Sequence, residues 1–227
     1  MSLIRRYPPA YTWQNRQRLY RLPSGLLVPA VTTILRKTRS QEAQVSLQQW
    51  RQRVGEQEAD HISQEAIARG NALHQRLSRY LMCKKMRPCS PKLTPWRDSL
   101  IPLMQTIKNT QLVEGMVFHE LLLYAGTVDA IVNIEGRGVT LCDWKTANRA
   151  RRESWLLDYK LQVVAFWKAI QETYDIQLDY VLIAIALPDQ EAQQVWLNPD
   201  ELEELWSVWL DRLKQWQDLS CANESRR

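Results

Sequence analysis

The sequence contains no apolar stretch long enough to cross a lipid bilayer, for which a helix needs about 20 apolar residues. Residues 1–13 include Arg5, Arg6 and two prolines but no apolar h-region, so a secretion signal is not expected. These absences disfavour membrane proteins and secreted proteins. We therefore expect a cytoplasmic protein.

Cysteine is scarce, and its positions follow no recognised pattern. Cys83, Cys89, Cys142 and Cys221 form no C-x-x-C pair and no zinc-like spacing. The pattern is typical of reduced thiols in a cytosolic protein. Internal repeats and low-complexity linkers are also absent, so a repeat array is not expected.

The composition indicates a folded chain. Of the 227 residues, 45% are hydrophobic and ten are tryptophans. This content predicts a packed core rather than disorder. The length suits one substantial domain, or a core with a helical extension.

The net charge of +5 is the sum of a basic first half and an acidic second half of the sequence. Residues 1–100 hold 18 Lys and Arg against 6 Asp and Glu, a balance of +12. Residues 101–227 hold 12 against 19, a balance of −7. The basic half is a candidate surface for a polyanion such as nucleic acid, although a merely solvated basic face is equally compatible with the count.

The first part of the chain is mainly helical in pattern. A short hairpin is expected at residues 18–31, with Pro23-Ser24-Gly25 as its turn. Helical patterns follow at residues 31–36, 41–53 and 58–82. The stretch 88–95 is rich in proline and interrupts them, and a further helix is expected at 96–110.

The second part is rich in strand patterns. Strands are expected at residues 115–124, 126–134, 139–145, 178–187 and 193–197, with a helix at 153–174. The run 178–187 is apolar throughout, as in a strand covered on both faces. A last helix, capped by Asn198, should run to about residue 218. Its apolar stripe is expected to be core rather than a base-stacking surface; it consists of Leu202, Leu205, Trp209, Leu213 and Trp216.

This order of elements predicts an α/β fold in which helices flank a mixed central sheet, with a helical N-terminal extension. We expect residues 1–110 to form a basic hairpin and helices that pack on a core of residues 111–227. The two parts would make one integrated domain.

The hairpin expected at residues 126–145 carries charged residues where a strand should be apolar. Asp143 and Lys145 share one strand face, because side chains alternate. A two-residue turn would place Asp129 opposite Trp144, on the wrong face. A three-residue turn at 135–137 would place Asp129 opposite Asp143, and one at 136–138 would place it opposite Lys145. We predict an odd turn, or a bulge with the same effect.

Opposed carboxylates repel each other unless a cation lies between them. A hard divalent cation such as Mg²⁺ or Mn²⁺ prefers such oxygen ligands and can activate water for phosphodiester hydrolysis. Lys145 could orient that water or stabilise charge on the phosphate. The simpler alternative is a surface ion pair between Lys145 and Asp129 or Asp143.

The sequence Val128-Asp129, followed by Asp143-Trp144-Lys145, resembles the signature of the PD-(D/E)XK nucleases. Residues 69–74, Arg-Gly-Asn-Ala-Leu-His, resemble the G-x-x-x-H motif of their RecB-like branch. In that motif Gly70 would permit close approach to the sheet and His74 would complete the metal site. A lone helical histidine is otherwise usually structural, and His61 and His119 have no such context.

Residues 159–166 resemble the third motif of the family, which places a Gln on the helix after the D-x-K strand. Gln162 would then support the site; the alternative is a core Gln bonded to backbone. The segments 28–35, 113–114 and 119–120 resemble the mitochondrial genome maintenance exonuclease group. Together these matches imply a bacterial or phage relative with a restriction-endonuclease-like core.

The resemblance implies a role for each matched residue. His74, Asp129, Asp143 and the Trp144 carbonyl would bind Mg²⁺ or Mn²⁺, and Lys145, Gln162 and Tyr159 would assist catalysis. Glu114 and Glu120, expected on one face of one strand, could support these ligands or hold a second metal. The DNA contacts would come from Arg36, Lys37, Arg39, Arg51, Arg53, Arg69 and Thr146.

Related nucleases carry an iron–sulfur cluster on four cysteines, three of them near the C-terminus, where this chain has only Cys221. We therefore predict no cluster. The expected function is a metal-dependent DNA exonuclease for single strands or DNA ends, acting in repair, replication or recombination, with replication or recombination proteins as possible partners. The alternatives are a structure-specific endonuclease and an inactive DNA-binding module.

Overall fold

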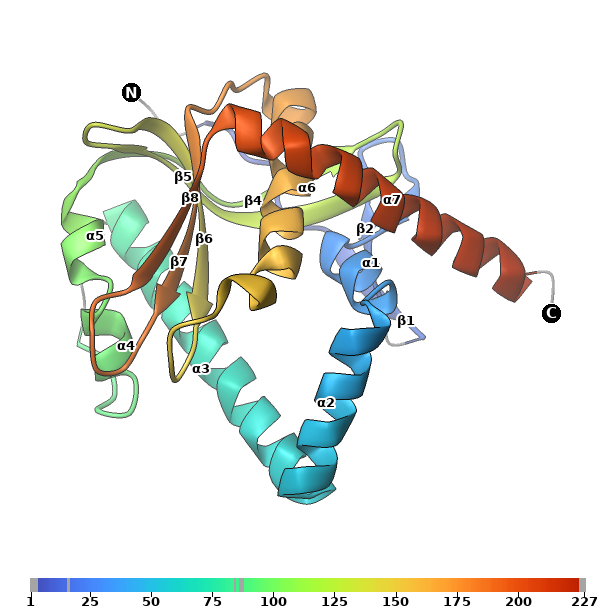
Figure 1. The fold of residues 1–227 in the computed structure, drawn as a ribbon. Helices are drawn as coiled ribbons and strands as arrows, with labels where there is room; N and C mark the ends of the chain where they lie inside the picture. Colours follow the sequence, from blue (N-terminus) through green and yellow to red (C-terminus); the bar gives the residue numbers. More distant parts are fainter. Residues whose placement is uncertain (1–3, 16, 84, 86–87, 225–227) are drawn as a thin grey trace.

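The computed structural model describes residues 4–15, 17–83, 85 and 88–224. A mixed sheet of five strands, in the order β4-β5-β6-β7-β8, forms its centre (Figure 1). Within this sheet β6 and β7 are parallel, and the other neighbouring strands are antiparallel. The strands are β4 (Ile107–His119), β5 (Tyr124–Ile134), β6 (Gly138–Thr146), β7 (Tyr180–Ala186) and β8 (Gln193–Leu197).

Helices cover both faces of this sheet. One face is packed by α1 (Val31–Lys37), α6 (Leu157–Tyr174) and α7 (Pro199–Glu224), with the short helix η1 (Glu153–Trp155) leading into α6. The other is packed by α3 (Glu56–Cys83), α4 (Thr94–Asp98) and α5 (Ile101–Gln105). Helix α2 (Gln41–Val54) and α3 form a V that projects from the body (Figure 1).

A second, small sheet precedes these elements and consists of β1 (Tyr11–Gln14), β2 (Gln17–Arg21) and β3 (Leu27–Pro29). The strands β2 and β3 form the hairpin expected at residues 18–31. The expected α/β class, with a mixed sheet flanked by helices, is confirmed. No helix among the described residues is both long and apolar enough to span a membrane.

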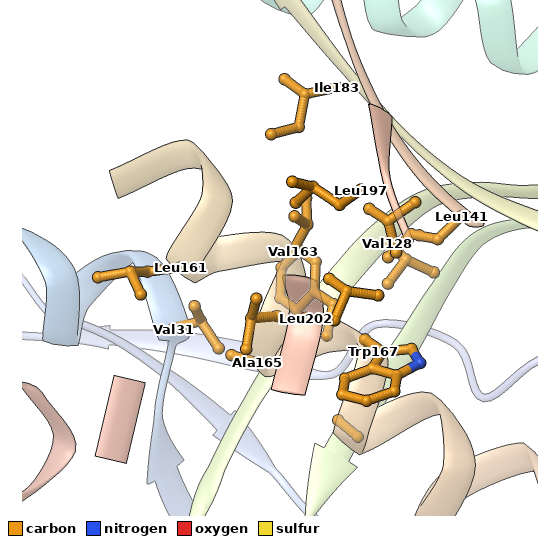
Figure 2. Packing of buried hydrophobic residues seen from close by; sticks show 14 of the residues in the cluster. Val31, Val128, Leu141, Leu161, Val163, Ala165, Trp167, Ile183, Leu197 and Leu202 are labelled. Atoms are coloured by element: carbon orange, nitrogen blue, oxygen red, sulfur yellow. The ribbon is translucent and has the colours of Figure 1, made fainter. Parts of the chain in front are cut away.

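Alternation along the strands divides the core into two layers. Leu141 packs with the side chains of α6, whereas Cys142 packs with those of α3. Figure 2 shows Leu141 and Val128 in the layer that packs on α6, close to Val163 of that helix. The strand β7 is buried over almost its whole length, as its continuous apolar run predicted. The sheet is therefore covered on both faces.

The C-terminal helix confirms the expected capping and the expected stripe. Asn198 and Glu201 exchange side-chain-to-backbone hydrogen bonds of 3.0 and 2.9 Å at its start. Leu202, Trp209 and Leu213 are buried against α6. These three residues therefore belong to the core.

The prediction of one helix at residues 96–110 is wrong. Two short helices, α4 and α5, occupy its first part, each with a proline in its first turn. At Ile107 the chain enters β4 because it pairs with the end of β5 at Ile134. The boundary expected at residue 110 thus lies inside a strand, and the two parts of the chain share one core.

Gly70 of the expected helical motif and Gly126 at the start of the expected hairpin differ in the space around them. A Cβ added at Gly126, on β5, would lie 2.3 Å from Cε1 of Phe166 on α6. One added at Gly70 would meet nothing closer than Thr146 Oγ1 at 4.0 Å, an ordinary contact. The expectation that Gly70 is needed for close approach to the sheet is therefore wrong, while Gly126 allows α6 to approach β5.

We expect Gly126→Ala to destabilise the protein by about 1–3 kcal/mol, because the methyl group overpacks the contact with Phe166. Gly70→Ala is the matched control and should be neutral or stabilising by up to about 1 kcal/mol, because Ala favours the helix. Thermal unfolding measures both. Restoration of stability in Gly126→Ala by Phe166→Leu would identify the clash, and an unchanged melting temperature for Gly126→Ala would contradict this packing.

Candidate metal centre

The turn between β5 and β6 sets the register of the charged hairpin. Ile134 pairs with Gly138, so residues 135–137 form a three-residue turn. Gly136 and Gly138 have φ values of 71° and 78°, in the left-handed region that glycine tolerates. The odd turn predicted from strand parity is confirmed. Its register places Asp129 across from Asp143.

The two strands separate just before this point. Their last paired residues are Ala130 and Cys142. Beyond them, Oδ2 of Asp129 accepts a hydrogen bond of 2.7 Å from the backbone N–H of Trp144. Trp144 itself remains paired with Ala184 of β7. The Asp129 carboxylate therefore lies in the gap between the strands and replaces the missing ladder bond.

His74 reaches the same gap from α3. Its Nδ1 lies 3.0 Å from Oδ1 of Asp129, and its Nε2 lies 2.7 Å from the carbonyl oxygen of Trp144. Both partners are acceptors, so the doubly protonated ring fits this arrangement, and the nitrogen that ligates a cation would have to lose its proton. Burial opposes the charge, but the Asp129 carboxylate outweighs it and raises the pKa of His74. The expected proximity of His74, Asp129 and the Trp144 carbonyl is present.

Glu114 completes the group from β4. Val113 pairs with Ala130 and Gly115 with Val128, so Glu114 lies across from Asp129. Its φ of 50° is rare for a residue with a side chain. Burial raises the pKa of its carboxyl group. Ligand atoms of Glu114, His74 and Asp129 all lie within 4.8 Å of one another.

Two residues that support Glu114 were not identified from the sequence. Ser78, one turn after His74 on α3, donates a hydrogen bond of 2.8 Å to Oε1 of Glu114. The guanidinium of Arg6 donates to the carbonyl oxygens of Val113 and Glu114, at 3.3 and 3.4 Å. Neither residue lies in a motif, and each contact joins distant parts of the chain, so no local signal could have revealed them.

Asp143 and Lys145 form an ion pair on the face of β6 that α6 covers. Asp143 is only 3% exposed, so the alternative of a surface ion pair does not apply. Gln162 of α6 donates a hydrogen bond of 3.0 Å to Oδ1 of Asp143. The alternative of a core Gln bonded to backbone is therefore wrong. The Lys145 ammonium lies 5.3 Å from the ring centroid of Tyr159.

The charges of this pair depend on each other. Burial raises the pKa of the Asp143 carboxyl, although the Lys145 ammonium opposes this effect. Burial opposes the charge of Lys145, but Asp143 and Asp129 outweigh it and raise the pKa of the amine. Lys145 therefore stays protonated across the neutral range.

The residues present fit a divalent cation. One imidazole nitrogen and two carboxylate oxygens converge from three elements, and the Trp144 carbonyl lies against the same imidazole. Mg²⁺ and Mn²⁺ favour such oxygen-rich sets. The convergent acids are Glu114 and Asp129, whereas the oxygens of Asp143 face Gln162 and Lys145. From the sequence, Glu114 was expected to support the ligands or to hold a second metal.

Glu120 is not part of this group. The strand β4 ends at His119, and Glu120 lies exposed in the following turn, where its N–H donates to Glu172. The expectation that one strand face carries both Glu114 and Glu120 is therefore wrong. His61 and His119 pair with Glu65 and Glu172, away from the site.

The residues expected to contact DNA are dispersed. Arg51 is paired with Glu56 and Asp60, and Arg39 lies 3.8 Å from Asp158. Arg69 stacks on Trp96 at 4.6 Å. The remaining positions lie on exposed helix faces or at the end of β6; they are Arg36, Lys37, Arg53 and Thr146. Cys142 is buried, Cys89 is half-buried, and Cys83 and Cys221 are exposed; no disulfide joins cysteines within the described part of the chain.

Comparison with known proteins gives two curated relatives. The chain is 25% identical over 203 residues to mitochondrial genome maintenance exonuclease 1 of Homo sapiens, covering 85% of this chain and 59% of the relative. It is 26% identical over 203 residues to the protein of that name from Mus musculus, covering 84% and 59%. The chain is thus homologous to these exonucleases and spans about 59% of their length. No family model matches.

Two crystal structures are weakly similar. One is a candidate exonuclease from Eubacterium rectale, with 10% identity, 66% of this chain and 68% of that chain covered, and a TM-score of 0.43. The other is SSO0001, with 14% identity, 73% and 69% covered, and a TM-score of 0.33. These scores are too low to carry a further conclusion.

Binding of Mn²⁺ or Mg²⁺ should stabilise the folded chain, since the unfolded chain lacks the assembled site. At 100 times the dissociation constant the gain is about 2.7 kcal/mol, or a rise of several degrees in melting temperature. Asp129→Asn should abolish this rise, which is measured by thermal unfolding with and without metal. His61→Ala, at an exposed histidine, is the control. A full metal-induced rise in Asp129→Asn would contradict the assignment.

Proposed function

We propose that this chain, a homologue of the mitochondrial genome maintenance exonucleases, is a metal-dependent DNA exonuclease of the PD-(D/E)XK type. The observation that carries the proposal is the convergence of His74, Glu114 and Asp129 beside the buried Asp143–Lys145 pair. This combination supplies ligands for a cation and a positive charge for a phosphate within one site.

In this proposal His74, Glu114, Asp129 and the Trp144 carbonyl hold Mg²⁺ or Mn²⁺, and Asp143 is the further carboxylate of the site. When bound there, such a cation would polarise the phosphodiester and would favour the ionised form of an attacking water. Ser78 fixes the carboxylate of Glu114, and the Trp144 N–H fixes that of Asp129. The ligands are thus oriented by the fold before metal binds.

Lys145 acts in this proposal as a cation rather than as a base. Its raised pKa keeps the ammonium charged, so it can stabilise negative charge that develops on the phosphate. Gln162 holds Asp143, and Asp143 in turn positions Lys145. The ring centroid of Tyr159 lies 5.3 Å from the same ammonium.

The substrate is proposed to be DNA, as single strands or frayed ends, and the role to be in repair, replication or recombination. The names of the relatives support a function in genome maintenance. Single strands are favoured because the exposed Arg36 and Lys37 of α1 and Arg53 of α2 can follow a flexible backbone. Replication or recombination proteins are the proposed partners.

End-labelled single-stranded and double-stranded DNA should be degraded with Mg²⁺ or Mn²⁺ and stay intact with EDTA. Lys145→Ala should reduce the cleavage rate by about 100- to 1,000-fold, the effect of removing one group that stabilises transition-state charge. It should retain DNA binding. Lys108→Ala, which removes a surface pair with Glu135, is the matched control. Unchanged cleavage by Lys145→Ala would refute the assigned role.

Circular single-stranded DNA separates the exonuclease from its alternatives. An exonuclease that needs ends leaves the circle intact while it degrades the linear form of the same sequence. Cleavage of the circle would instead establish an endonuclease. Binding of linear DNA without cleavage, with both metals, would indicate an inactive DNA-binding module.

A further inference from the structure

The loop between β6 and α6, residues 147–156, has an unusual concentration of positive charge. It begins two residues after Lys145 and contains Arg149, Arg151 and Arg152. This loop lies in the acidic half of the sequence. Among the described residues, none of these three arginines forms an ion pair with a carboxylate, although neighbouring Lys160 and Arg212 do. The charge of the loop is therefore available to an external anion.

The loop also presents an aromatic ring to solvent. Trp155 is 58% exposed, whereas the tryptophans of the α7 stripe are buried or partly buried. The guanidinium groups of Arg151 and Arg152 each lie 5.9 Å from its ring centroid. An exposed indole flanked by arginines combines a stacking surface with positive charge.

This loop is attached to the sheet at two places. At its start, the N–H of Ala147 donates to Ala186 at 3.0 Å, and its carbonyl accepts from Trp96 Nε1 at 2.9 Å. Further on, the side-chain amide of Gln193 bonds both the N–H and the carbonyl of Arg151, at 2.7 and 2.9 Å. The loop backbone is thus held in place before any ligand binds, which lowers the entropy lost on binding.

Two arginines, one in this loop and one on α3 beside it, have buried side-chain donors. Nε of Arg151 and Nε of Arg69 are buried, and neither has a hydrogen-bond partner among the described protein atoms. Arg69 stacks on Trp96 at 4.6 Å, and Trp96 in turn bonds Ala147. Buried donors usually have an acceptor. Phosphate oxygens suit guanidinium groups, which can bind them with two parallel hydrogen bonds.

We propose that this loop holds a single strand of nucleic acid next to the site, with one base stacked on Trp155 and phosphates contacted by Arg151 and Arg152. The proposal rests on the proposed nuclease function and adds the element that holds its substrate. A single strand fits better than a duplex, because its bases are free to stack on an aromatic ring.

The direct test is equilibrium binding of a fluorescein-labelled oligothymidylate in EDTA, followed by fluorescence anisotropy, so that cleavage does not interfere. Trp155→Ala should weaken binding by about 5- to 100-fold, the range for loss of one stacked base. Trp155→Phe retains a ring and should stay near the wild-type affinity. Trp13→Ala, which removes another exposed tryptophan on β1, is the control and should bind as the wild type does.

The arginines are tested by the salt dependence of the same binding. A plot of log K against log salt has a negative slope. Arg152→Gln should reduce the magnitude of that slope by about 0.7, the value for one phosphate contact on a single strand. Arg21→Gln removes an exposed arginine of β2 and should leave the slope unchanged. A slope in Arg152→Gln equal to that of the wild type would overturn the phosphate contact.

The possible results separate this proposal from the function on which it rests. If the wild type neither binds nor cleaves the strand, both are wrong. If the wild type cleaves linear DNA while Trp155→Ala binds and cleaves as the wild type does, only the loop assignment is overturned. Weaker binding by Trp155→Ala, with the circular dichroism spectrum of the wild type and recovery in Trp155→Phe, supports the loop.

Discussion

The structure around the site depends on the two bonds of one carboxylate. Asp129 lies where β5 and β6 separate; one oxygen accepts from the Trp144 N–H and the other faces His74. A carboxylate buried in this way would be destabilised by desolvation, but His74 lowers its pKa and keeps it ionised. The same contacts tie α3 to the sheet. The separation of the strands, the position of α3 and the charge of the site therefore all depend on the contacts of the Asp129 carboxylate.

Strand parity allowed the central part of this arrangement to be predicted from the sequence. Side chains alternate, so the number of turn residues alone decided whether Asp129 could lie opposite Asp143. Helical spacing likewise identified the buried stripe of α7. The motifs predicted that His74 and Gln162 lie close to the acids of the hairpin, as they do in the structure. These predictions succeeded because each depends on local geometry or on a short matched segment.

The predictions that failed depended on long-range contacts. Residues from Ile107 onward join β4 because β5 offers a pairing partner, which no local propensity reveals. Glu120 was placed on a strand that in fact ends one residue earlier. The position of Glu114 follows from a left-handed backbone conformation supported by Arg6, 108 residues away in sequence. Local patterns carry no information about such contacts.

The distribution of charge along the sequence likewise does not show which charges the fold leaves unpaired. The basic half was a candidate surface for a polyanion because its excess of Lys and Arg is large. In the structure, however, Arg51 bonds two acids of α3 and Arg39 faces Asp158. The loop after β6 lies in the acidic half, but its arginines have no carboxylate partner among the described residues. Two of them, Arg151 and Arg152, lie beside the exposed Trp155. A polyanion responds to charge that is left unpaired by the fold. Net charge summed over the sequence therefore does not identify the surface on which unpaired charge remains after folding.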